Sequence, residues 1–158
     1  MTIYQSIEEI QAAIGHEVGP SRWFTLDQQR IDGFGRITED EQWIHTDPER
    51  AASGPFGTTV AHGYLTLALV SPIVMEIFQV ENLHSAINYG MNKVRFPAPV
   101  PAGSRVRGTA VIEACEPVGK ALQISLTVSI TAEGSTRPAC VAEFLMRVVA
   151  ASAQPVHA

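Results

Sequence analysis

The sequence has few of the residues that would hold a fold together through disulfides or bound metals. It contains two cysteines, Cys115 and Cys140, and they do not have the spacing of a metal-ligand pair. Its first residues lack the basic and apolar regions of a secretion signal. We therefore expect a cytoplasmic protein in which both thiols are free and pack as small apolar side chains.

Long hydrophobic runs and an excess of positive charge are also missing. The most apolar stretch, residues 64–80, is interrupted by polar residues and by Pro72, so it falls short of the roughly 20 apolar residues that span a bilayer. Acidic residues outnumber basic ones by 16 to 11, which gives a formal charge of −5. This balance argues against a nucleic-acid partner, and we expect no membrane partner either.

The common nucleotide-binding motifs are absent as well. The sequence has neither a G-x-G-x-x-G run nor a P-loop, and no histidine or cysteine cluster resembles a zinc or iron site. We expect no cofactor and no metal.

The composition that remains is that of one compact domain. The chain has 158 residues, of which 46% are hydrophobic and 17% charged, which is enough apolar surface for one real core. We expect a single domain over residues 1–150 and a flexible tail over residues 151–158.

Helical signals fill the first half of the chain. Ser6 with Glu9 is typical of a capping box, and Asp47 followed by Pro48 is typical of a helix start. Three further elements are expected here: a strand over residues 23–26, a helix over 27–38 with Ile31, Phe34 and Ile37 near helical spacing, and one long apolar helix over 63–78.

The second half changes to a period of two. Apolar and polar residues alternate over residues 122–131 and again over 106–112, and a turn is expected at 116–119 between these two strands. Further strands are expected over 86–96 and 139–149. Because the connections between the last three strands are short, we expect an antiparallel meander.

These elements predict an α+β protein with the hot-dog fold. A curved antiparallel sheet that wraps around the long central helix would cover the apolar surface of that helix. The exposed sheet edges would be satisfied by pairing with a second copy, so we expect a homodimer or a higher homo-oligomer.

The chemistry is concentrated in two short motifs, and the first is Asp40-Glu41-Gln42-Trp43-Ile44-His45. Five residues along a helix turn two side chains roughly 140° apart, and five along a strand put them on opposite faces. Asp40 and His45 can therefore meet at one small ligand only if the backbone between them is irregular. The surrounding helix signals place them at a junction between helices.

The second motif is Ala61-His62-Gly63, at the start of the long apolar helix. The first N–H groups of a helix have no partner within it, and Gly63 leaves that backbone open to a carbonyl oxygen. We expect Gly63 to donate to an oxyanion, whereas His62 could also be a satisfied core or interface histidine. With an acid and an imidazole nearby, such a site suits a reaction that passes through an enolate.

Two pairs of basic residues lie on the expected strands. Lys93 and Arg95 share a face of one strand, and Arg105 and Arg107 share a face of the next. They are candidates to bind the phosphates of a carrier such as coenzyme A, although the pattern itself favours a solvated strand face.

Taken together, the motifs resemble the MaoC-like (R)-specific enoyl-CoA hydratases, and among them the nodulation protein N-like branch. The resemblance covers most of the chain. It is carried by Asp40-x4-His45, Phe56-Gly57, Ala61-His62-Gly63-Tyr64, Tyr89-Gly90-Met91-Asn92-Lys93-Val94-Arg95-Phe96 and Pro99-Val100. In the family the first motif usually reads Asp-x-Asn-Pro-x-His, whereas Gln42 and Trp43 stand at its third and fourth positions here.

The resemblance implies a hydro-lyase of fatty acid metabolism with a hot-dog fold. The reaction would be the reversible addition of water to trans-2-enoyl thioesters, carried by coenzyme A or by an acyl carrier protein. Asp40 and His45 would activate one water, and the Gly63 N–H would polarise the thioester carbonyl. His62 would help to shape the turn before Gly63 and would not act as a base. Coenzyme A would be part of the substrate, so no separate cofactor is implied.

Two other functions use the same features. A hot-dog acyl-CoA thioesterase would bind a similar ligand and release free thiol. A non-catalytic acyl-thioester binding protein would bind the ligand without turnover, but binding alone needs neither Asp40 nor His45.

Overall fold

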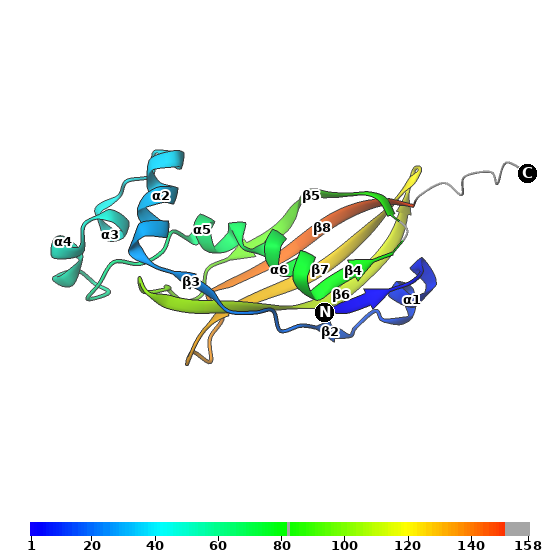
Figure 1. The fold of residues 1–158 in the computed structure, drawn as a ribbon, viewed down its shortest axis with the longest axis horizontal. Helices are drawn as coiled ribbons and strands as arrows, with labels where there is room; N and C mark the ends of the chain where they lie inside the picture. The colour runs from blue at the N-terminus through cyan, green and yellow to red at the C-terminus, as the bar shows by residue number, and fades with distance from the viewer. Residues whose placement is uncertain (82, 151–158) are drawn as a thin grey trace, which may run out of the picture.

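The computed structural model describes residues 1–81 and 83–150 (Figure 1). The expected flexible tail over residues 151–158 lies outside this range. Within the described part of the chain, no helix is both long enough and apolar enough to cross a membrane.

A six-stranded antiparallel sheet forms most of the second half of the chain (Figure 1). Its order is β2-β6-β7-β8-β5, with β3 also paired to β6. The strands are β2 (Glu17–Val18), β3 (Phe24–Leu26), β5 (Leu83–Arg95), β6 (Ser104–Val118), β7 (Ala121–Ala132) and β8 (Cys140–Ala150). The expected meander is formed by β6, β7 and β8. Strand β5 precedes them in the sequence and pairs with β8 on the side that β7 leaves open.

As expected, apolar and polar side chains alternate along β7, and they lie on opposite faces of the sheet. Ile124, Leu126, Val128 and Ile130 are buried, whereas the polar residues between them are only partly covered. The expected turn over 116–119 is displaced, because Pro117 still pairs with Leu122 and Val118 with Ala121 in the ladder. The turn therefore falls at residues 119–120, where Gly119 takes a positive φ of 61°.

The central helix is present, but it consists of two segments. Helix α5 (Gly63–Ala68) is followed by α6 (Val70–Ile77), with Leu69 between them. The expectation of one unbroken helix over 63–78 is wrong because Pro72 has no N–H to donate to the carbonyl of Ala68. The helix also ends before Phe78, where β4 (Phe78–Val80) begins and pairs in parallel with β1 (Thr2–Tyr4).

Helix α6 lies across the sheet and forms the centre of the core (Figure 1). Its buried side chains include Val70, Ile73 and Ile77. Gly108 on β6 lets this helix approach closely, because a Cβ built there would lie 2.8 Å from Cγ2 of Ile73. The missing side chain at Gly108 thus sets the spacing between helix and sheet.

The remaining helices are α1 (Ile7–Ala12), α2 (Gln28–Thr38), α3 (Trp43–Thr46) and α4 (Pro48–Ala52). Helices α2, α3 and α4 gather at one end of the molecule, away from α1 (Figure 1). The Asp27 and Asp47 side chains accept N–H groups in the first turns of α2 and α4. This helical end holds the Asp40-to-His45 segment.

Two details of the helix predictions need correction. Ser6 caps α1, but the Glu9 carboxylate accepts the N–H of Gln5 and not that of Ser6, so the box is shifted by one residue. On α2, Ile31 is buried, whereas Ile37 is 86% exposed because it lies about 120° around the helix from Ile31.

Substitution of Gly108 by alanine tests the helix-sheet spacing. We expect Gly108→Ala to lower the free energy of unfolding by about 1–3 kcal/mol, because the new methyl group overpacks against Ile73. Gly33→Ala on α2 is the control, since a Cβ there meets nothing closer than 4.0 Å. Urea unfolding of both variants measures the difference, and equal stability would contradict this packing account.

Candidate active site

The structure brings Asp40 and His45 together with His62. One side-chain ligand atom from each of the three lies within 4.8 Å of the others. Helix α2 ends with Glu39 in the left-handed conformation, the chain turns through residues 40–42, and His45 follows in the one-turn helix α3. The expected junction between helices is therefore present, although His45 itself lies in a short helix.

His45 is held by the segment that precedes α5. Its Nδ1 lies 2.6 Å from the carbonyl oxygen of Val60, and the N–H of Val60 donates to the carbonyl of Ile44 at 3.0 Å. A carbonyl only accepts, so the hydrogen of neutral His45 is on Nδ1. Its Nε2 then carries a lone pair, which is the form that can act as a base.

The surroundings of His45 favour the neutral imidazole. Its side chain is buried, and this burial is the main cause that lowers its pKa below 6.5. The hydrogen bond to Val60 and the charge of Asp40 act in the opposite direction, while the proximity of His62 lowers the pKa further.

His62 contacts both other members of the cluster. Its Nε2 lies 2.8 Å from the main-chain carbonyl oxygen of Asp40, and its ring stacks on that of His45 at a centroid distance of 3.8 Å. The ring of Phe34 lies on it at 5.0 Å. His62 is 1% exposed, and its Nδ1 has no hydrogen-bond partner among the described residues.

Gly63 is the first residue of α5, so its N–H has no partner within the helix. It borders a hollow of about 290 Å³ that also exposes apolar side chains, among them Phe56, Phe96 and Val100. Because α5 has only six residues before the break at Leu69, any anion stabilisation here depends on the local amide and not on a long helix dipole.

Sequence reasoning missed Gln28, which ties three segments of the site together. Its Nε2 donates to the carbonyl of His45 and to the Asp32 carboxylate, both at 2.7 Å, and its Oε1 accepts from the hydroxyl of Thr59. These partners are 4, 17 and 31 residues away in sequence. The contacts with His45 and Thr59 join segments that no local motif connects.

Gly35 on α2 was also missed, although it permits the close approach of the Asp40 loop. A Cβ at this position would lie 3.0 Å from the carbonyl oxygen of Asp40 and 3.6 Å from Cε1 of His62. A side chain would therefore push this loop away from the helix.

The four basic residues do not gather at this cluster. Lys93 pairs with Glu143 at 3.4 Å, and Arg95 donates to the neighbouring carbonyl of Val94. Arg105 forms a two-bond pair with Glu133.

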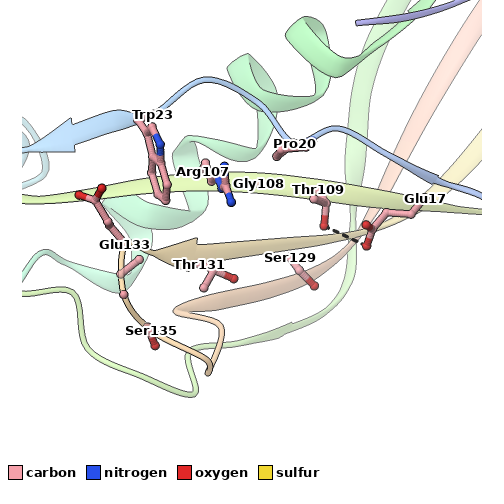
Figure 2. Close-up of a pocket in the computed structure, with 12 residues that line it drawn as sticks. Glu17, Pro20, Trp23, Arg107, Gly108, Thr109, Ser129, Thr131, Glu133 and Ser135 are labelled. Carbon is pink, nitrogen blue, oxygen red and sulfur yellow. Dashed lines mark hydrogen bonds between the residues drawn. The ribbon is translucent and has the colours of Figure 1, made fainter.

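Arg107 lies over the ring of Trp23, 4.5 Å from its centroid, and borders a hollow of about 480 Å³. Figure 2 shows residues that line this hollow, with Trp23 and Arg107 beside each other and Glu133 near them. Asp40, His45, His62 and Gly63 do not line it. It is therefore separate from the cluster.

The cluster contains residue types that bind metals, which sequence reasoning did not anticipate. However, the two imidazole planes are only 27° apart and stack face to face. Their in-plane lone pairs therefore lie in nearly parallel planes, and the rings would have to turn before they could share one ion. The expected absence of a metal stays a prediction.

Comparisons with known proteins indicate the same family and the same fold. Residues 9–134 match the family model of the MaoC like domain. The chain is 49% identical over 151 residues to 3-hydroxyacyl-thioester dehydratase Z of Mycobacterium tuberculosis, covering 95% of this chain and 100% of that protein. It is 41% identical over 143 residues to Nodulation protein N of Rhizobium leguminosarum bv. viciae, covering 89% of each.

A solved structure agrees in fold. The (R)-hydratase from A. caviae superposes with a TM-score of 0.67 over 84% of this chain and 94% of that one, at 20% sequence identity.

The Gln28 contacts can be tested by stability. In Gln28→Leu, the His45 carbonyl and the Thr59 hydroxyl lose their partner, so we expect the free energy of unfolding to fall by about 1–3 kcal/mol. The same substitution at the exposed neighbour, Gln29→Leu, is the matched control. Denaturant unfolding compares the two, and an equal loss in both variants would mean that Gln28 holds nothing in place.

Proposed function

The chain belongs to the MaoC-like dehydratase family, in its nodulation protein N-like branch, and is a hydro-lyase; from this premise we propose that it adds water reversibly to trans-2-enoyl thioesters. The product would be the (R)-3-hydroxyacyl thioester. The observation that carries this proposal is the convergence of Asp40 with a buried His45 whose Nε2 is free to accept a proton.

In the proposed reaction, Asp40 and His45 hold one water between them. The water oxygen attacks C3 of the enoyl group as one water proton passes to His45. The C2=C3 π electrons move toward the thioester carbonyl and form an enolate-like state, and the proton taken from the water by His45 is then delivered to C2. Dehydration reverses these steps. A placed acid or base of this kind contributes about 10² to 10⁴ in rate.

The Gly63 N–H is the proposed donor to the thioester oxygen. This proposal is supported by its position at the start of α5 and beside the apolar hollow that includes Phe56 and Phe96. The hollow would take the acyl chain. An oxyanion donor of this kind is typically worth about 3–4 kcal/mol of barrier.

The carrier is proposed to be coenzyme A or an acyl carrier protein, with no separate cofactor. Among the four basic residues, Arg95 and Arg107 are the better candidates for its phosphates, because Lys93 and Arg105 are already paired with glutamates. We also propose a homodimer: β5, with 13 residues, forms one edge of the sheet, and its Ile87 and Tyr89 side chains are exposed.

Replacement of either catalytic side chain should remove most turnover. We expect Asp40→Asn and His45→Gln each to lower kcat on crotonyl-CoA by about 10²- to 10⁴-fold while the fold is retained. Asp47→Asn, which keeps a good helix cap, and His84→Gln on the exposed surface of β5 are matched controls expected to turn over normally.

Loss of the enoyl absorbance measures hydration, and a thiol-reactive dye in parallel detects thioester hydrolysis. Near-normal hydration by Asp40→Asn or His45→Gln would reject the assignment. Release of free thiol in place of hydration would support the thioesterase alternative.

The pH dependence follows from the lowered pKa of His45. As a base, His45 works when neutral, and activity should fall as the pH drops through its pKa. Because burial lowers that pKa below 6.5, we expect the acidic limb of kcat/KM to have its midpoint below pH 6.5. A pH series with crotonyl-CoA measures this midpoint, and a value above 6.5 would show that another group controls the limb.

A further inference from the structure

We propose that His62 is a positioning residue that fixes Asp40 and His45 relative to each other, through its hydrogen bond to the Asp40 carbonyl and the stacking of its ring on His45. The expected effect on turnover rests on the proposed function, whereas the contacts of His62 with Asp40 and His45 do not involve a substrate. It gives His62 a role beyond shaping the turn before Gly63.

The hydrogen of neutral His62 lies on Nε2. Its Nε2 lies 2.8 Å from the main-chain oxygen of Asp40, which can only accept a hydrogen bond, so this nitrogen must carry the hydrogen. His45 has the opposite arrangement, because its Nδ1 donates to Val60. Two backbone carbonyls therefore set complementary tautomers on two stacked rings.

Asp40 follows the end of α2, and its side chain is exposed. The approach of its carbonyl to α2 depends on the missing side chain at Gly35. The hydrogen bond from His62 joins this loop to the start of α5, so the carboxylate is carried on a backbone anchored at two points.

The ring of His62 lies between two other rings. His45 stacks on it at 3.8 Å and Phe34 contacts it at 5.0 Å. Since His62 is almost fully buried, its ring cannot move away without opening a cavity beside His45. The position of the His45 ring is thus defined on its face by His62 and at its edge by Val60.

His62 also influences when His45 takes up a proton. Two titratable groups act on His45 directly: Asp40 favours its charged form and His62 disfavours it. Asp32 lies one step further, on the opposite side of the Gln28 amide. His62 disfavours the charged form of His45 only when its own ring also carries a proton. A side chain at residue 62 that cannot take up a proton removes this competition and leaves Asp40 in place, so His45 should protonate at a higher pH.

Two variants separate the two contacts of His62. His62→Gln keeps an amide donor near the position of Nε2 but removes the ring, whereas His62→Phe keeps a ring over His45 but removes the donor. We expect kcat for crotonyl-CoA hydration to fall at least about tenfold in each, because small displacements of reacting groups are costly. The midpoint of the acidic limb should rise in both variants.

A variant that weakens only the core serves as the control. Ile73→Val truncates a fully buried side chain on α6, and we expect it to lower the melting temperature while the kcat and the acidic midpoint stay at their normal values. If the His62 variants lose activity with an unchanged midpoint, or keep kcat within about twofold, the positioning role is rejected.

Nitrogen-15 NMR of the histidine rings tests the same inference without turnover. In the unmodified protein we expect the hydrogen of His62 on Nε2 and that of His45 on Nδ1, with the titration midpoint of His45 rising in folded His62→Gln or His62→Phe. A His62 hydrogen on Nδ1 would overturn the proposal. If the protein does not hydrate thioesters but these NMR results hold, the proposed function fails and the positioning role stands.

Discussion

The hydrogen bond from Nδ1 of His45 to the carbonyl of Val60 is the interaction on which the site depends. It decides which ring nitrogen is free, and it places the imidazole beside Asp40. Val60 is itself fixed, because it forms an isolated bridge with Pro101, and the next residue, Ala61, donates to the carbonyl of Val100. The segment that carries Val60 is therefore bonded to the chain just before β6, and the base is positioned by contacts that continue into the sheet.

The molecule thus divides its tasks between a regular part and an irregular part. The sheet and α6 form the apolar core, in which close packing at Gly108 sets their spacing. The helical end has short helices and polar contacts made by side chains such as Gln28. Gly35 allows these pieces to come close enough for an exposed carboxylate and two buried imidazoles to meet.

The sequence predicted the regular part well, because its signals are local. Alternation over residues 122–131 places Ile124 and Leu126 inside, and the cap at Asp47 begins a helix as local rules require. Errors arose where two rules compete. Apolar composition favoured one long helix, but Pro72 divides it. Ile37 has near-helical spacing from the other apolar residues of its helix, yet its side chain is exposed.

From the sequence we could predict which residues form the site, but not most of the contacts that position them. The spacing of Asp40 and His45 excluded regular structure between them, which led to the expected junction. The role of Gln28 and the stacking of His62 on His45 depend on contacts across 17 or more residues, which no local pattern encodes. Hydrogen positions on the two rings likewise follow from which carbonyls lie opposite them.

A crystal structure of the inactive Asp40→Asn protein with a bound 3-hydroxyacyl-CoA tests the central claim most directly. The account predicts that the 3-hydroxyl lies within hydrogen-bond distance, about 3 Å, of both residue 40 and Nε2 of His45, with the thioester oxygen on the Gly63 N–H. A ligand whose hydroxyl contacts neither side chain, or whose carbonyl points away from Gly63, would contradict it.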